Sequence, residues 1–101
     1  MEVCQNDDSA FLLTRFNQRD TSAFAMIYTR FFTELHVYAN RLYANTFESA
    51  EDAVQEAFCY LWERHDVVFD SLMKIKAFLF VAIKNRYKNH MSHLGVEQKY
   101  R

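Results

Sequence analysis

The sequence predicts an all-α fold, a compact bundle of four main helices. Helix breakers are nearly absent, because the 101 residues include no proline and a single glycine, whereas sheets and long ordered loops normally use more of both. Apolar residues recur at spacings of three, four and seven along several segments, which is the period of an amphipathic helix. Half of the chain is apolar and 17% is aromatic, which is enough for a real core at this length.

The first two helices are predicted from caps and from apolar spacing. The first covers about residues 9–17, and its candidate N-cap residues are Asp7, Asp8 and Ser9. The apolar side of this helix consists of Phe11, Leu12, Leu13 and Phe16. The second covers about residues 22–43, and its candidate N-cap residues are Asp20 and Thr21. Its apolar residues show the clearest helical period: Phe24, Ile27, Tyr28, Phe31, Leu35, Tyr38 and Leu42.

The third and fourth helices follow a connection at residues 44–48. The third is predicted from Ala50 to about Arg64, and Ser49 with Asp52 resembles a capping box with Asp in place of Glu or Gln. At about 100° per residue its apolar side contains Val54, Ala57, Phe58 and Leu61, with Ala50 and His65. The fourth is predicted from Leu72 to Leu94, with Gly95 as a natural stop. Its candidate N-cap residues are Asp70 and Ser71, and its core side is Ile75, Phe78, Leu79, Ala82 and Ile83.

The opposite side of the third helix is a compact acidic and amide patch, formed by Asp52, Gln55, Glu56, Cys59 and Glu63. A solvated face near the positive N-terminal end of the helix explains Asp52 well, but it explains the continuation through Gln55, Glu56 and Cys59 less well. Charge is also segregated along the chain. Residues 1–70 carry five arginines against twelve acidic residues, a net of −7, and residues 71–101 carry seven basic residues against one acidic residue, a net of +6. This segregation points to a polyanion bound at the C-terminal end and a different partner at the acidic end.

The basic fourth helix favours a nucleic-acid partner over a merely solvated face. Its basic residues are Lys74, Lys76, Lys84, Arg86 and Lys88, with no acidic residue between Asp70 and Glu97. Asn85 and Asn89 suit base edges, because amide side chains both donate and accept hydrogen bonds. Four aromatic residues are candidates to stack on unpaired bases: Phe69, Phe78, Phe80 and Tyr87. Core packing is the stronger alternative for Phe78, and it explains Phe80 and Tyr87 less well.

Nothing in the sequence indicates catalysis, a cofactor or a metal site. The only glycine is Gly95, so there is no glycine-rich phosphate loop, and His90 with His93 supplies two ligands where a closed metal site needs more. Cys4 and Cys59 show no paired spacing, so we expect free thiols in a reducing cytoplasm. No stretch of about 20 apolar residues occurs, and the segment MEVCQNDDS does not resemble a signal peptide, so we expect no membrane association.

Three segments together resemble a known family. The segment EDAVQEAF at 51–58, followed by Leu61 and Trp62, resembles the conserved second region of bacterial RNA polymerase sigma factors of the sigma-70 family. More narrowly, it is similar to the small extracytoplasmic-function sigma factors. The segment FNQRDTSAFAMIY at 16–28 resembles the opening of that family, and LMKIKAFLFVAIKNRYKN at 72–89 resembles its promoter-facing helix. The resemblance covers about residues 9–94.

The resemblance implies a role in transcription initiation. The patch residues Asp52, Gln55 and Glu56, with Cys59 beside them, would dock on the clamp helices of the largest catalytic subunit of core RNA polymerase. The loop at 66–73 and the following helix would recognise and melt the promoter −10 element, holding the non-template strand with one base flipped into a pocket. The DNA-binding residues are then Phe69, Lys74, Lys84, Asn85, Lys88 and Asn89. An anti-sigma factor is a further candidate partner. The loop is more apolar than the family pattern and lacks glycine, which leaves its base preference open.

We expect residues 1–95 to form this region 2 domain and residues 96–101 to begin a linker to a C-terminal region 4 domain that the chain lacks. In the family, that second domain reads the −35 element through a helix-turn-helix. Two binding alternatives remain. One is a helical protein–protein adaptor that uses the acidic patch and never touches DNA. The other is a duplex-binding helix-turn-helix protein, although no short glycine-containing turn joins two adjacent helices. An enzyme is the least favoured reading.

Overall fold

The computed structural model describes the backbone of residues 2–44, 46, 48–64 and 66–99, and the side chains of residues 9–44, 46, 48–64 and 66–91. This part of the chain contains no strand and four α-helices: α1 (Glu2–Asn17), α2 (Thr21–Leu42), α3 (Ala50–Glu63) and α4 (Leu72–Lys99). The predicted all-α fold of four helices is therefore confirmed. No helix among the described residues is long and apolar enough to cross a membrane. His65 and the side chains of Cys4 and His93 lie outside the described residues.

Three of the predicted helix starts are confirmed by their caps. The Asp20 carboxylate accepts a hydrogen bond of 2.8 Å from the Ser22 N–H at the start of α2. The Ser49 hydroxyl accepts one of 3.2 Å from the Asp52 N–H, and the Ser71 hydroxyl accepts one of 3.2 Å from the Lys74 N–H. Each cap satisfies a backbone donor that the first turn of a helix leaves without a partner.

Two predicted helix ends were wrong. α1 begins at Glu2 rather than near Ser9, so the cap-forming residues Asp7, Asp8 and Ser9 lie inside the helix. No proline or glycine precedes them, and cap-forming residues lower helix propensity by only a few tenths of a kcal/mol. α4 likewise continues through Gly95 to Lys99, because an isolated glycine costs about 1 kcal/mol relative to alanine and does not by itself end a helix.

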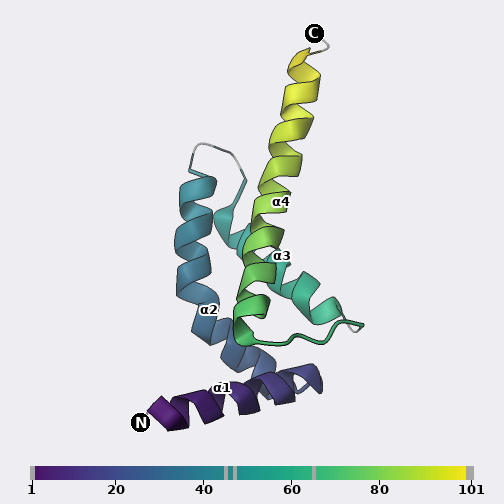
Figure 1. Ribbon diagram of the computed structural model, residues 1–101. Helices are drawn as coiled ribbons and strands as arrows, with labels where there is room; N and C mark the ends of the chain where they lie inside the picture. The colour runs from purple at the N-terminus through teal and green to yellow at the C-terminus, as the bar shows by residue number, and fades with distance from the viewer. Residues whose placement is uncertain (1, 45, 47, 65, 100–101) are drawn as a thin grey trace.

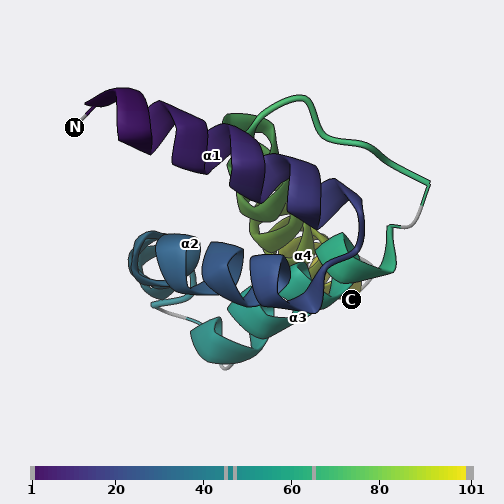
Figure 2. The same cartoon turned by 90° about the horizontal axis from the view of Figure 1, so that it is seen from below.

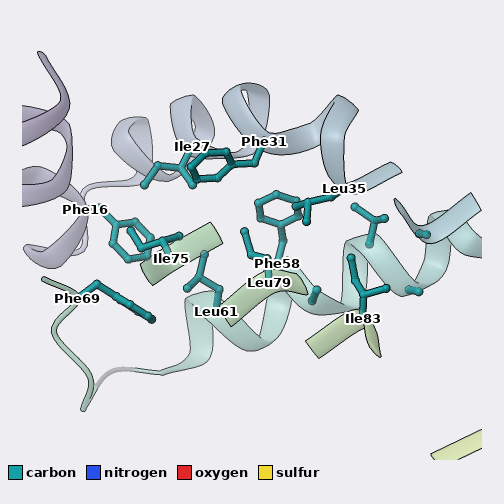
Figure 3. Close-up of a cluster of buried hydrophobic side chains, with 14 of the residues drawn as sticks. Phe16, Ile27, Phe31, Leu35, Phe58, Leu61, Phe69, Ile75, Leu79 and Ile83 are labelled. Carbon is teal, nitrogen blue, oxygen red and sulfur yellow. The ribbon is translucent and has the colours of Figure 1, made fainter. Parts of the chain in front are cut away.

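The core lies where the apolar stripes of α2, α3 and α4 meet (Figure 3). α2 contributes a residue at every fourth position, namely Ala23, Ile27, Phe31, Leu35 and Ala39. α3 contributes Ala53, Val54, Ala57, Phe58 and Leu61, and α4 contributes Ile75, Leu79 and Ile83. Leu12 and Phe16 of α1 close one end of this cluster. The alanines allow neighbouring helices to approach closely, and the larger side chains fill the remaining volume.

Figure 1 shows how this packing arranges the helices. α2 and α4 lie side by side, and α3 crosses behind α4 in this view and contacts both of them. α1 lies across the end of the bundle where α2 begins, and Figure 2 shows it alongside the first half of α2. The last turns of α4 project beyond the other helices. The arrangement leaves one side of α3 and one side of α4 facing solvent.

Two aromatic residues expected to lie outside the core pack against α2 instead. The Phe80 ring meets Tyr38 edge-on at 4.9 Å between centroids, and the Tyr87 ring meets Tyr43 in the same way at 5.5 Å. Both rings are partly buried against the core cluster. The side of α4 that carries these two rings faces α2. Packing against α2 therefore covers the ring surfaces that would have to be open to stack on a base.

Candidate functional site

The polar side of α3 faces solvent because the other side of the same helix is core. We call this surface, formed by Asp52, Gln55, Cys59 and Glu63, the α3 face. All four side chains are exposed. The remaining residue of the predicted patch, Glu56, is less accessible, with 39% of its side chain exposed, because its carboxylate is paired with α4.

An apolar groove adjoins the α3 face, a feature that the sequence reasoning missed. Its volume is about 340 Å³, and it lies between α2 and α3, with Gln55, Cys59 and Glu63 at its edge. Its apolar lining consists of Phe24, Tyr28, Phe58 and Trp62. The helical period assigned Phe24, Tyr28 and Phe58 to the apolar sides of their helices, and Trp62 lies at the flank of α3. Together these four large rings leave a partly open surface between the two helices. An apolar floor beside an acidic and amide edge suits a partner helix that carries apolar and basic side chains.

Arg19 contacts Trp62, one of the residues that line this α2–α3 groove. Its backbone has a positive φ of 66°, a conformation that is costly for a residue with a side chain. The guanidinium lies 4.1 Å from the centre of the Trp62 ring and donates a hydrogen bond to the Trp62 carbonyl. The sequence indicated only a helix break at this position, whereas the side chain connects the α1–α2 turn to the end of α3.

The loop between α3 and α4 is anchored to α1 by one amide side chain. Asn17 Nδ2 donates to the Phe69 carbonyl at 3.0 Å, and the Phe69 N–H donates to Asn17 Oδ1 at 3.1 Å. The Phe69 ring is only 8% exposed and packs against Phe16 and Phe78. Phe69 was predicted to stack on a base. In this structure Phe69 belongs to the core cluster and helps to hold the loop in place, and it also lines the larger groove described next.

A larger groove of about 1070 Å³ runs between this loop, α3 and α4, and we call it the α4 groove. It brings together four residues predicted to bind DNA, although they are up to 20 positions apart in sequence: Phe69, Lys74, Asn85 and Asn89. The loop contributes Val67, Val68 and Asp70, and α3 contributes Tyr60 and Arg64. Asn85 and Asn89 are exposed on the wall of the groove, and Lys74 pairs with Asp70 at 3.0 Å.

Lys84 and Lys88 lie outside the groove, exposed on the neighbouring arc of α4. Apolar side chains of the loop and of α4 are also open to solvent: Val68 is 72% exposed, Met73 68% and Val81 52%. Of these, Val68 and Val81 line the groove. The Tyr60 ring, 46% exposed, stands on the opposite wall. The surface therefore combines exposed lysines beside the groove with cationic, amide, aromatic and apolar side chains that line it.

Arg86 joins α4 to α3 at the inner end of the groove. Its Nη1 lies 2.6 Å from Glu56 Oε1, and its Nη2 lies 2.8 Å from Glu48 Oε1. Burial acts to lower the pKa of the guanidinium, but the hydrogen bond to Glu48 and the charges of both glutamates raise it above its ordinary value. The Tyr60 hydroxyl donates to Glu56 Oε2 at 2.7 Å, and this bond with the charge of Glu56 raises the pKa of the phenol.

These side chains can bind a single nucleic-acid strand without any covalent chemistry. Cations outside the groove suit a phosphate backbone, and amides, an aromatic ring and apolar side chains suit unpaired bases. Tyr60 of the α4 groove is on the same helix as the α3 face but is not one of the residues of that face.

The Sigma-70 region 2 family model matches residues 27–95. The match covers α3, most of α2, and α4 as far as Gly95, and so includes both the α3 face and the α4 groove. No curated protein and no solved structure matches the chain.

Proposed function

Because the chain belongs to the Sigma-70 region 2 family, we propose that it binds core RNA polymerase through the α3 face and recognises and melts the promoter −10 element through the α4 groove. One observation carries this proposal. α3 has an exposed acidic face on one side, which suits the polymerase. With α4 it also forms a groove that contains amide and cationic residues, which suits DNA. The three sequence segments described above favour the extracytoplasmic-function type, which acts in the bacterial cytoplasm.

The polymerase partner is the pair of clamp helices in its largest catalytic subunit. Asp52, Gln55 and Cys59 are exposed on one side of α3, and the apolar α2–α3 groove begins beside them. Binding energy at protein interfaces concentrates in apolar pockets that a polar rim shields from water. The rim supplies orientation, and the rings of Phe24 and Trp62 supply apolar contact area.

Replacing Asp52 with Asn and Gln55 with Ala together should lower the affinity for core polymerase about tenfold or more, equivalent to about 1.4 kcal/mol. Both side chains are exposed, so the free energy of unfolding should change by under about 0.5 kcal/mol for each. The measurement is a binding titration with core polymerase, alongside a thermal melt. Thr33→Ala, exposed on the outer side of α2, is the control. Equal affinities for the double variant and the control would exclude the α3 face as the docking surface.

The DNA partner is the non-template strand of the −10 element. Asn85 and Asn89 lie one helical turn apart on the groove wall and offer amide groups to the base edges. Lys84 and Lys88 lie outside it, where a backbone would pass. The strand should therefore bind with its phosphates toward the lysines on the outer arc of α4 and with a flipped base toward the loop. Base flipping costs a few kcal/mol, and the contacts to the flipped base must offset that cost.

Lysine and asparagine substitutions on α4 should have different consequences. Lys84→Ala or Lys88→Ala should weaken binding to every strand about equally and reduce the salt slope by about one. Asn85→Ala or Asn89→Ala should instead reduce the difference in binding free energy between a −10-like strand and a scrambled strand by roughly 1–3 kcal/mol. Fluorescence titrations of both strands at several salt concentrations, on the polymerase-bound chain, measure these effects.

The same titrations separate the proposal from its rivals. Tighter binding to the −10 duplex than to its single strand would favour a helix-turn-helix mode. Absence of binding to both at low salt would favour a protein–protein adaptor. If the asparagine variants lose affinity for both strands alike, these amides do not read bases.

A further inference from the structure

Glu56 belongs to two surfaces at once. It continues the acidic patch of α3, yet it also lines the α4 groove. Its two carboxylate oxygens are both engaged on the groove side. Oε1 lies 2.6 Å from Arg86 Nη1, and Oε2 accepts the Tyr60 hydroxyl at 2.7 Å. In the free chain, therefore, Glu56 is turned away from the partner that the α3 face would bind.

The same contacts occupy two groups that the groove would use for DNA. Arg86 lines the groove on α4 together with Asn85 and Asn89. Its guanidinium can bind a phosphate or a carboxylate, because both accept hydrogen bonds from the same fork of N–H donors. Glu56 and Glu48 both occupy donors of this fork, so a phosphate would have to compete with two carboxylates for Arg86. Tyr60 offers the groove an exposed aromatic face, but its hydroxyl is held by Glu56.

Resting on the function proposed above, we propose that Arg86 and Tyr60 are additional strand-binding residues. In the free chain both are bound to the Glu56 carboxylate, and polymerase docking releases them by drawing that carboxylate toward the α3 face. Glu48 keeps one contact to Arg86, at 2.8 Å, so the guanidinium stays in place when Glu56 leaves. One branch of its donor fork is then open to a phosphate. The Tyr60 ring is already exposed, and without the hydrogen bond to Glu56 its side chain is free to turn and align with a base.

This arrangement links the two partners energetically. Anything that removes the Glu56 carboxylate from Arg86 raises the affinity for the strand. By thermodynamic reciprocity, a strand that occupies Arg86 raises the affinity for polymerase by the same factor. The chain would then bind promoter strands weakly by itself and more tightly on the enzyme.

The test is strand affinity of the free 101-residue chain, measured by fluorescence anisotropy with a −10-like single-stranded oligonucleotide. Glu56→Gln should raise this affinity about five- to tenfold, a typical size for coupling between sites. Asp70→Asn is the matched control, because it also removes one negative charge from the groove lining but releases only the exposed Lys74. Its gain should be under about twofold, since exposed ion pairs are weak.

A double-mutant cycle measures the part of the gain that depends on Arg86. In an Arg86→Gln background, Glu56→Gln should keep only the part of its gain in strand affinity that comes from releasing Tyr60, whereas the small effect of Asp70→Asn should persist. Tyr60→Ala alters an exposed side chain, so it tests the ring without threatening the fold. It should lower strand affinity about fivefold in the Glu56→Gln variant and under twofold in the unaltered chain.

With saturating core polymerase, the unaltered chain and Glu56→Gln should bind the strand equally, because polymerase has already displaced the carboxylate. Equal gains in strand affinity from Glu56→Gln and Asp70→Asn would overturn the proposal. A Glu56→Gln gain that is undiminished by Arg86→Gln, or one that persists on polymerase, would also overturn it. Failure of the underlying function looks different, because the unaltered chain on polymerase would then not bind the strand.

Discussion

Replacing Leu79 with alanine should lower the free energy of unfolding by about 2–5 kcal/mol, the range for a buried leucine that leaves a cavity. The Leu79 side chain is fully buried on α4, and Figure 3 shows it close to Phe58 of α3. Domains of this size are stable by only about 5–15 kcal/mol, so this loss is a large part of the total. Chemical denaturation followed by circular dichroism gives the value.

Val81→Ala is the matched control for this substitution. Val81 lies two residues further along the same helix and is 52% exposed, so its truncation should change the free energy of unfolding by under about 0.5 kcal/mol. If Val81→Ala lowers the free energy of unfolding as much as Leu79→Ala does, the apolar stripe of α4 has been assigned to the wrong side of the helix.

Replacing Asn17 with alanine should release the loop that forms one wall of the α4 groove. The amide makes two hydrogen bonds to the backbone of Phe69, and both backbone groups are partly buried. Leaving a buried donor or acceptor without a partner costs about 1–3 kcal/mol, so the stability loss should fall in that range. Discrimination between −10-like and scrambled strands should also fall, because the loop residues Val67 and Val68 would lose their position.

Amide hydrogen exchange at Phe69 is the direct measurement, since its N–H donates to Asn17 Oδ1. Asn17→Asp keeps the acceptor and loses the donor, so it should preserve part of the protection that Asn17→Ala removes. Asn40→Ala, exposed on α2, is the control and should leave Phe69 protected. Undiminished protection of Phe69 in Asn17→Ala would show that the aromatic contacts of Phe69 alone hold the loop.

Local pattern was sufficient for most of the helical architecture. The four-residue repeat of α2 and the caps at Asp20, Ser49 and Ser71 were readable because each involves groups within about one turn of a helix. The same period placed Asp52, Gln55 and Cys59 on one exposed side of α3. Where the local signal was weak, as at the start of α1 and at Gly95, the predicted ends were wrong.

The sequence by itself therefore determined the fold class, the order of the helices, the core stripes and the exposed side of α3. Only the tertiary structure decided that Phe69 is buried, that Asn17 anchors it across 52 positions, and that Arg86 draws Glu56 toward the α4 groove. The physical reason is the sequence distance over which each kind of signal acts. A helical period reports which side chains of one helix share a side, but pairings between helices depend on how those helices cross. The crossing is set by the packing of many side chains together.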